Sequence, residues 1–377
     1  MELINIRLGD YIERSTINNK DLKYGGDLIV GVNSQGVFAT PKGNTDGVDL
    51  KPYKIVENGA FVYNPTRLEL GSIAYRTEGL CIVSHLYMVF YLTDEGKKII
   101  DPMWLYIYFR RSEFCREVTF RNFGSQRPEF NFNDMSDIII PLPDIEIQKK
   151  YVDIYNAMLE NQKSYEYGLE DLKLACDAYI EDLRRQMPCE AIATYIEEVN
   201  KKNVGNLKLN SVRGIATSKE FINTKANMEG VSLESYKVVE PGMIAFISDT
   251  SRRADKMSIA LNQSEENYLV SSISTVIQTD NTKLLPKYLY LFFCRTEFDR
   301  YARFHSWGSA RETFSLDDMK EVRMPLPSID VQKSIVGIYE AYTIRKEINE
   351  KLKAQIKAIC PILIKGSIEE ARKAKEA

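Results

Sequence analysis

A short loop that could bind a phosphate group or a DNA base occurs twice in this sequence of 377 residues. Gly124-Ser125-Gln126-Arg127 recurs as Gly308-Ser309-Ala310-Arg311. Glycine permits tight backbone geometry, serine and a backbone N–H can hold a phosphate oxygen, and arginine can donate two hydrogen bonds to phosphate or guanine. The alternative is that each loop docks its domain onto a neighbouring helix, and the sequence favours neither interpretation.

A second set of polar and basic residues lies between short β-like runs in both halves of the sequence. Polar loops on a rigid scaffold are suited to contacts with base edges. The candidate DNA-binding residues are Lys42, Asn64, Arg67, Arg76, Ser125, Gln126 and Arg127 in the first half, and Lys225, Arg252, Arg253, Lys256, Ser309 and Arg311 in the second. For the loop charges the alternative is an ordinary solvated side chain.

The sequence lacks the glycine-rich motifs with which many enzymes bind nucleotides and cofactors. Asn64 begins the nearest approach to the Asn-Pro-Pro-aromatic tetrapeptide of an amino-methyltransferase, but the second proline and the aromatic residue are missing. Asp144, Glu146 and Lys149 could form a nuclease-like group, yet acidic residues at a predicted helix start also favour the helix dipole. We therefore predict a non-catalytic protein, with a stand-alone methyltransferase as the enzyme alternative.

Metal ions, cofactors and a membrane are equally unsupported by the sequence. The six cysteines are scattered without a Cys-x-x-Cys pair, and the two histidines are His85 and His305, so no zinc site is predicted. The longest apolar stretch, residues 81–92, is too short to span a bilayer, and the N-terminus has no signal-peptide pattern. We expect a cytoplasmic protein with reduced cysteines and no metal or cofactor of its own.

The charge distribution gives no strongly basic domain. The net charge of −3 divides into −3 over residues 1–144, −3 over 145–188, 0 over 189–328 and +3 over 329–377. A protein that binds DNA alone usually carries a basic footprint. A DNA-binding role would therefore need a local basic face, or a partner that supplies contacts to phosphate.

An internal repeat decides the predicted architecture. Residues 109–158 align with residues 293–342 at an offset of 184, and 22 of the 50 positions are identical. Upstream, residues 47–59 match residues 230–242 with a slightly different offset. A period this long predicts tandem domains rather than a solenoid. Each half has β-like runs, a helix-like segment after Pro102 or Pro286, a Pro-Leu-Pro segment and a long helix, which is an α+β plan.

The two long helices carry apolar stripes. Positions from 151 to 183 that step by four and three are apolar or aromatic with one exception, Gln162, which could set the register of a coiled coil. We expect one helix over residues 151–187, ended by Pro188, and a second helix interrupted by Pro361. We favour pairing of the two helices, because each stripe needs a partner; the alternative is two separate surface helices.

The duplicated arrangement resembles the DNA-specificity (S) subunit of type I restriction-modification enzymes. The residues that carry the resemblance are Gly124, Ser125, Arg127, Pro141, Pro143, Gln148 and Lys149, and then Gly308, Ser309, Arg311, Pro325, Pro327, Gln332 and Lys333. The resemblance covers the whole chain. Each motif alone is weak, but their duplication ahead of two long helices is specific.

This resemblance implies two α/β target-recognition domains, at residues 1–144 and 189–328, each reading one half of a split site in double-stranded DNA. It implies that residues 145–188 and 329–377 form antiparallel spacer helices. The implied partners are two modification (methyltransferase) subunits carrying S-adenosylmethionine, and restriction subunits that use ATP. An interaction scaffold without a DNA role is the alternative outside the enzymes. The base-contacting residues vary within the family, so our site residues rest on their chemistry.

Overall fold

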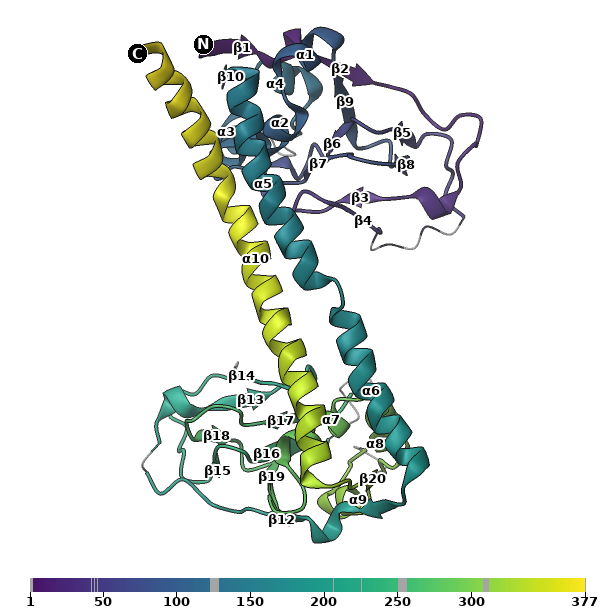
Figure 1. Cartoon of the computed structure of the whole chain (residues 1–377), viewed down its shortest axis with the longest axis vertical. Helices are drawn as coiled ribbons and strands as arrows, with labels where there is room; N and C mark the ends of the chain where they lie inside the picture. Colours follow the sequence, from purple (N-terminus) through teal and green to yellow (C-terminus); the bar gives the residue numbers. More distant parts are fainter. Residues whose placement is uncertain are drawn as a thin grey trace. The chain divides into compact units, whose positions relative to one another are not determined.

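The chain forms two compact units, each built from one globular domain and two helical segments (Figure 1). The structure is a computed structural model that describes residues 3–41, 43, 45, 47–122, 129–205, 207–224, 226–249, 256–307 and 312–376. Unit 1 comprises Met1–Tyr165 and Ile348–Ala377, and unit 2 comprises Glu166–Glu347. None of the described helices is long and apolar enough to cross a membrane.

The centre of unit 1 is an antiparallel four-stranded sheet. Its order is β2 (Ile12–Ser15), β9 (Met88–Leu92), β6 (Phe61–Tyr63) and β7 (Ile73–Tyr75). Three two-stranded ladders accompany it: β1 (Ile4–Arg7) with β10 (Ile139–Leu142), β3 (Gly31–Val32) with β4 (Phe38–Ala39), and β5 (Lys54–Val56) with β8 (Cys81–Val83). The β-branched and aromatic residues of these short runs suit a pleated surface with a buried face.

Helices cover one side of this sheet and enclose an aromatic core. The helical elements of the domain are η1 (Leu8–Asp10), η2 (Gly26–Leu28), η3 (Leu68–Leu70), α1 (Asp94–Ile99), α2 (Pro102–Phe109), α3 (Ser112–Arg121) and α4 (Phe132–Ser136). Pro102 begins α2, and the Asp101 carboxylate caps it by accepting hydrogen bonds from the Met103 and Trp104 N–H groups at 2.8 and 3.1 Å. Phe61, Phe90 and Trp104 are fully buried in this core.

Unit 2 repeats the plan with the same connectivity. Its four-stranded sheet has the order β12 (Ile196–Glu198), β19 (Ser274–Thr279), β16 (Ile244–Ile247) and β17 (Ser258–Leu261). The ladders are β11 (Cys189–Ala191) with β20 (Arg323–Pro325), β13 (Arg213–Ile215) with β14 (Phe221–Asn223), and β15 (Lys237–Val239) with β18 (Tyr268–Val270). The helical elements are η4 (Ile192–Thr194), η5 (Leu209–Ser211), α7 (Pro286–Phe293), α8 (Thr296–Phe304) and α9 (Leu316–Lys320). The predicted α+β duplication is confirmed.

A buried glutamine joins each globular domain to the long helix that follows it. In unit 1, the Gln148 carboxamide donates to the carbonyls of Ile99 and Pro143 at 2.8 and 2.7 Å. It also accepts a hydrogen bond from the Asp101 N–H at 2.8 Å. In unit 2, Gln332 makes the three equivalent bonds, to Lys283 O, to Pro327 O and from Leu285 N, at 2.8 to 2.9 Å. Both side chains are fully buried. The Pro-Leu-Pro…Gln segment therefore holds the start of each long helix against the residues that precede α2 or α7.

The long helices pair in unit 1. There α5 (Ile145–Glu166) lies beside the C-terminal part of α10 (Ile329–Glu376). Lys150 contacts Glu370 at 2.8 Å, and the Gln162 carboxamide donates to Asn349 at 2.8 Å, so the two segments run antiparallel. The Trp104 indole donates to Ser367 at 3.1 Å and ties α10 to the core. The prediction of paired helices is confirmed for this unit, and a register role for Gln162 stays a prediction.

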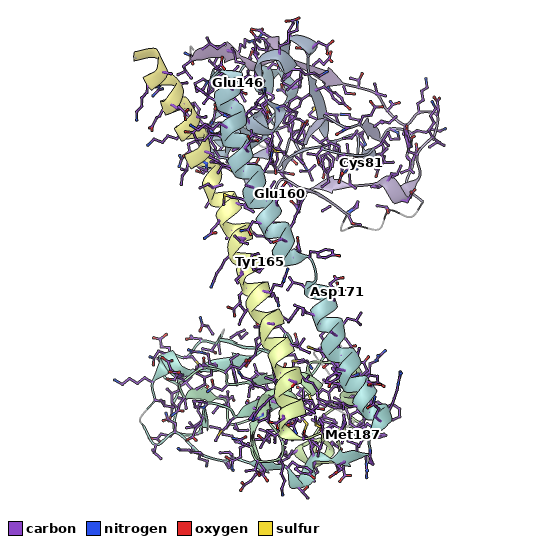
Figure 2. All side chains as sticks on the ribbon, in the orientation of Figure 1. Cys81, Glu146, Glu160, Tyr165, Asp171 and Met187 are labelled. Atoms are coloured by element: carbon purple, nitrogen blue, oxygen red, sulfur yellow. The ribbon has the colours of Figure 1, made fainter. Side chains whose placement is uncertain are left out.

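Two details of the predicted helices are wrong. The first long helix is divided into α5 and α6 (Leu169–Gln186), because Gly168 adopts a left-handed φ of +79°. Figure 2 labels Tyr165 and Asp171 on either side of this break. The second helix continues through Pro361. Its neighbours Cys360 and Ile364 are buried in the core of unit 1, and this packing offsets the hydrogen bond that proline cannot donate.

We expect Gln148→Ala to destabilise the protein by roughly 3 kcal/mol, because it leaves three backbone groups that are buried or partly buried without their partner. The adjacent Lys149→Ala is the matched control. Lys149 is exposed, so its loss should change the free energy of unfolding by less than about 0.5 kcal/mol. Urea unfolding followed by circular dichroism measures both variants. Equal stabilities for the two variants would show that the glutamine does not hold the junction.

Candidate nucleic-acid interface

Four of the predicted DNA-binding residues lie in the described part of the chain: Asn64, Arg67, Arg76 and Lys256. The other nine lie outside the described residues: Lys42, Ser125, Gln126, Arg127, Lys225, Arg252, Arg253, Ser309 and Arg311. Both Gly-Ser-x-Arg loops are among these, so their phosphate-binding and docking interpretations stay predictions. Arg67 belongs to unit 1, where it lines a surface cavity.

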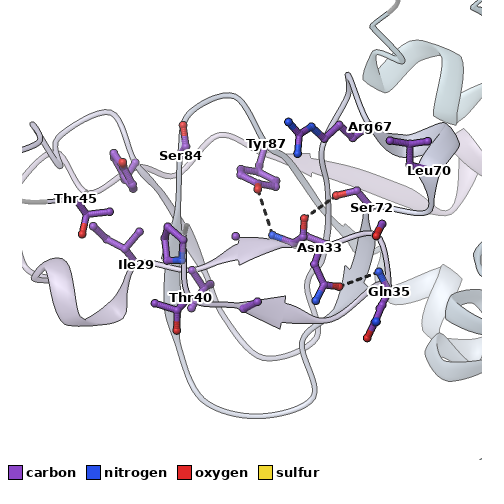
Figure 3. A pocket seen from close by; sticks show the side chains of 17 residues that line it. Ile29, Asn33, Gln35, Thr40, Thr45, Arg67, Leu70, Ser72, Ser84 and Tyr87 are labelled. Carbon is purple, nitrogen blue, oxygen red and sulfur yellow. Dashed lines mark hydrogen bonds between the residues drawn. The ribbon is translucent and has the colours of Figure 1, made fainter. Parts of the chain in front are cut away.

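The cavity of unit 1 lies between the β3–β4 hairpin, the loop that follows β6, and the β8–β9 turn (Figure 3). Its volume is about 640 Å³. Asn33, Ser34 and Gln35 contribute from the hairpin turn, Arg67, Leu70 and Ser72 from the β6–β7 loop, and Ser84 and Tyr87 from the β8–β9 turn. Apolar residues, among them Val32 and Ala39, share the lining with these polar groups, which could bond a ligand such as a nucleic acid. We call this cavity the unit 1 groove.

Local hydrogen bonds fix the walls of the unit 1 groove. The Asn33 carboxamide oxygen accepts from the N–H groups of Gln35 and Val37 at 2.9 and 3.3 Å, which shapes the hairpin turn. The Tyr87 hydroxyl accepts from the Val32 N–H at 3.2 Å, and the Ser72 hydroxyl donates to the Val32 carbonyl at 2.7 Å. Strand β3 is therefore bonded to both neighbouring loops (Figure 3).

Two side chains of the groove have hydrogen-bonding groups that could bind a ligand. The Arg67 guanidinium and the Gln35 carboxamide make no hydrogen bond to any residue in the described ranges, and both side chains are exposed. Arginine can donate two bonds to guanine, and glutamine can bond adenine in the same way. Lys54 adds a nearby charge: its ammonium donates to the Tyr87 carbonyl at 2.5 Å, and burial lowers its pKa. The exposed groups of Arg67 and Gln35 are thus suited to bonding base edges, and their contact with DNA stays a prediction.

Asn64 and Arg76 already have local partners. The Asn64 carboxamide oxygen accepts from the Thr66 N–H at 3.1 Å and from the Thr66 hydroxyl at 2.9 Å, which stabilises the start of the β6–β7 loop. The Arg76 guanidinium lies 5.2 Å from the centre of the Phe38 ring, and it donates to the Leu80 carbonyl at 3.5 Å. These contacts give both residues a role in loop structure, and their contact with DNA stays a prediction.

Unit 2 presents the corresponding hairpin and loop with different side chains. Lys256 is exposed and has no ion pair with the residues that the structure describes. The β13–β14 turn carries Lys219, whose φ of +70° matches the φ of +75° at Gly36 in the β3–β4 turn. The Lys219 ammonium is buried and pairs with the Asp299 carboxylate of α8. The Asp299 carboxylate also accepts from the Met257 N–H at 3.0 Å.

Sequence reasoning missed Gln35, Lys219 and Asp299. Alignment of Gly31 with Gly214 and of Phe38 with Phe221 places a turn between each pair. The replacement of Gly36 in the first half by Lys219 in the second was the sequence signal that this turn differs between the halves. Asp299 had no such signal, because its partner lies 80 residues away in the sequence.

The groups that could have served an enzyme have structural roles in the described residues. The Asp144 carboxylate accepts from the Glu146 N–H at 3.0 Å, and Glu146 pairs with Lys149 at 3.2 Å, as expected at a helix start. Burial raises the pKa of the Cys176 and Cys360 thiols to about 11, so both stay protonated at neutral pH. Within the described ranges, no cluster of His, Cys, Asp and Glu side chains could hold a metal ion.

The comparison with protein families identifies the class of this chain. The family model for the type I restriction modification DNA specificity domain matches residues 2–166 and again residues 195–358. These two matches cover most of the chain, one in each half of the duplication. The chain therefore belongs to the family of type I restriction-modification DNA specificity subunits. Among curated protein sequences, no significant match is found.

Solved structures of this class resemble the chain along nearly its full length. The type I restriction-modification S subunit from M. genitalium is 12% identical, with a TM-score of 0.59 over 98% of this chain and 96% of that chain. The HsdS subunit from Thermoanaerobacter tengcongensis is 16% identical, with a TM-score of 0.42 over 97% and 96%. A chain from a structure of type I R-M assembly is 15% identical, with a TM-score of 0.49 over 97% of both chains. The M. genitalium likeness shows a shared fold.

We expect Arg67→Ala and Gln35→Ala each to weaken binding to the specific duplex by about 1–3 kcal/mol, because each would remove a contact to a base edge. Both changes should also relax the sequence requirement at one position. Lys20→Ala is the control, since Lys20 is an exposed cation of the same domain outside the groove. Competition binding with duplexes substituted at single positions measures the effect. A uniform loss for all duplexes would mean that Arg67 contacts phosphate instead.

Proposed function

We propose that this chain is the DNA-reading subunit of a type I restriction-modification complex, in which each globular domain reads one half of a bipartite target. The observation that carries the proposal is the repetition of one rigid frame with different loops on it. Gln148 and Gln332 make the same three hydrogen bonds in the two units. The hairpin turns, in contrast, read Asn33-Ser34-Gln35-Gly36 in one unit and Ala216-Thr217-Ser218-Lys219 in the other. Two readers of different half-sites need this combination.

The near-neutral charge of the chain supports a partner-dependent mode of binding. A large share of the affinity of a protein for DNA comes from cations that neutralise phosphates. This chain has 50 basic and 53 acidic side chains, so it cannot offer a large excess of cations. In the proposal, the methyltransferase subunits supply many of the phosphate contacts. The Gly-Ser-x-Arg loops, with Arg127 and Arg311, add one contact each.

Docking of two methyltransferase subunits is supported by a repeated exposed aromatic residue. Phe120 is the penultimate residue of α3 and is 81% exposed, and Phe304 is the last residue of α8 and is 76% exposed. The two positions are related by the repeat offset of 184. An apolar side chain exposed in both copies of a duplicated frame fits two copies of the same partner. We assign docking to the helical side of each unit, namely the long helices with the ends of α3 and α8.

The proposal places the chemistry on the partners. The methyltransferase subunits would carry S-adenosylmethionine, and restriction subunits would bring ATP-dependent cleavage. This chain would bind DNA and orient the methyltransferases over the target bases. It would hold the DNA and the methyltransferases in a defined position. The complex would act in the cytoplasm, where DNA and both cofactors are present.

We expect an adenine methyltransferase to co-purify with the affinity-tagged chain from its native host, at two copies per chain. Phe120→Ser or Phe304→Ser should reduce this to one copy, because each removes one apolar contact. Val204→Ser is the control, since Val204 is 82% exposed but its counterpart in the first half is the polar residue Lys20. Native mass spectrometry gives the stoichiometry. Capture of no methyltransferase would favour the scaffold alternative, and DNA methylation by the pure chain alone would favour an enzyme.

A further inference from the structure

In each unit, one charged side chain from a helix connects the hairpin turn to a neighbouring loop of the four-stranded sheet. We call this connection the tie. In unit 1 this side chain is Arg110, which caps the C-terminal end of α2. Its guanidinium donates to the Gly71 carbonyl in the β6–β7 loop, and to the Ser34 carbonyl in the hairpin turn at 3.4 Å. Both bonds lie beside the unit 1 groove, which Ser34 lines. Arg110 therefore holds together two of the three walls of that groove.

Unit 2 makes the same connection with the opposite charge. The Asp299 carboxylate accepts from the N–H of Met257, the last residue of the β16–β17 loop, and pairs with Lys219 in the hairpin turn. Strand pairing shows that these positions correspond to those in unit 1. Tyr63 pairs with Ile73 and Phe246 pairs with Ile259, so Met257 is the counterpart of Gly71.

A shared tyrosine contact confirms that the two turns are equivalent. The Tyr106 hydroxyl donates to the Gly36 carbonyl at 3.1 Å, and the Tyr290 hydroxyl donates to the Lys219 carbonyl at 2.5 Å. Tyr106 and Tyr290 are related by the repeat offset of 184. Lys219 is thus the counterpart of Gly36, with the same left-handed backbone.

The Arg110 connection and a side chain at position 36 would compete for the same space in one unit. The position of Arg110 is occupied in unit 2 by Cys294, and the position of Asp299 is occupied in unit 1 by Cys115. A Cβ atom at Gly36 would lie 2.6 Å from the Arg110 guanidinium carbon, so a lysine at the turn would displace the guanidinium from its present place. A left-handed lysine is also strained, by about 1–3 kcal/mol. The duplicated chain has therefore kept the connection while exchanging the groups that make it.

We propose that these ties are positioning devices for base reading: Arg110 sets the first half-site, and the Lys219–Asp299 pair sets the second. The inference rests on the proposed function. A base contact needs its side chain within about 0.5 Å of the productive position. The reading residues lie on the hairpin and on the loop, which are separate in sequence, so their spacing depends on the tie. A tie that only stabilised the fold would not distinguish between half-sites.

The test maps methylated sites across the genome of the native host, whose own gene copy carries the variant. The wild-type chain first defines both half-sites. Arg110→Cys should lower the preference for the correct first half-site over single-base variants by roughly tenfold, and leave the second half-site unchanged. Asp299→Asn, which keeps an acceptor for the Met257 N–H but loses the charge, should do the reverse. Thermal unfolding of each purified variant reports its stability.

A transplant separates positioning from stability. Combining Arg110→Cys with Gly36→Lys and Cys115→Asp installs the tie of unit 2 in unit 1, and we expect it to restore most of the first half-site preference. The control keeps Arg110 and carries only Gly36→Lys and Cys115→Asp. Its preference for the correct first half-site should be lower than that of the wild type, because the lysine and Arg110 overlap. If Arg110→Cys does not fold, Arg110→Lys, which keeps the charge but not the fork of two donors, replaces it with the same expected direction.

The outcomes separate the two ideas. If the wild-type chain directs methylation to no split site, the proposed function fails. If it does so, but the variants lose stability with both half-site preferences intact, or relax both half-sites together, the positioning role is overturned. Failure of the transplant to recover any first half-site preference also overturns it, provided that the triple variant is folded.

Discussion

The junction between each globular domain and its long helix depends on one buried carboxamide. Gln148 and Gln332 each bond a carbonyl of the Pro-Leu-Pro segment and two backbone groups at the entry of α2 or α7. A buried side chain with three satisfied bonds has one orientation, because any other would leave polar groups unpaired. The helix therefore leaves the domain in one direction. Both α2 and α7 also supply the tyrosine that fixes the hairpin turn, so the same junction orients the helix and the candidate reading surface.

Around this common frame, the two halves differ at the surface in the manner expected of two readers. The unit 1 groove presents Arg67 and Gln35, and unit 2 presents Lys256 near a hairpin whose turn has a different sequence. The helix side chains that hold these surfaces also differ in charge. An arginine bonds backbone carbonyls in unit 1, and an aspartate bonds a lysine and a backbone N–H in unit 2. If each unit reads its own half-site, as proposed, a shared frame with different surface groups is the expected result.

Much of the fold could be predicted from the sequence, because the duplication and the long apolar stripes are local or periodic signals. The two errors in the helices have opposite causes, a backbone feature that overrides the periodic pattern in one case and tertiary packing that overrides a proline in the other. Gly168 breaks a stripe that continues across it, and Pro361 sits in a helix that tertiary packing sustains.

The candidate site was harder to predict. Arg67 could be named from its residue type and loop, but Arg110 and Asp299 act through partners distant in the sequence, and Gln35 became a candidate only through its place in the groove. Gln148 could be recognised as part of a motif. Its role in joining the domain to the helix became clear only from its hydrogen bonds to Ile99 and Asp101. Sequence patterns report which residues share an element, whereas a binding surface depends on which elements meet.

The central claim is that one frame carries two independent readers. The most direct measurement replaces residues 1–144 with the corresponding region of a relative that reads a different first half-site, and maps methylated sites by sequencing in the presence of the partner methyltransferase. The account predicts a new first half-site, with the second half-site and the gap between them unchanged. A change in both half-sites, or in neither, would contradict it.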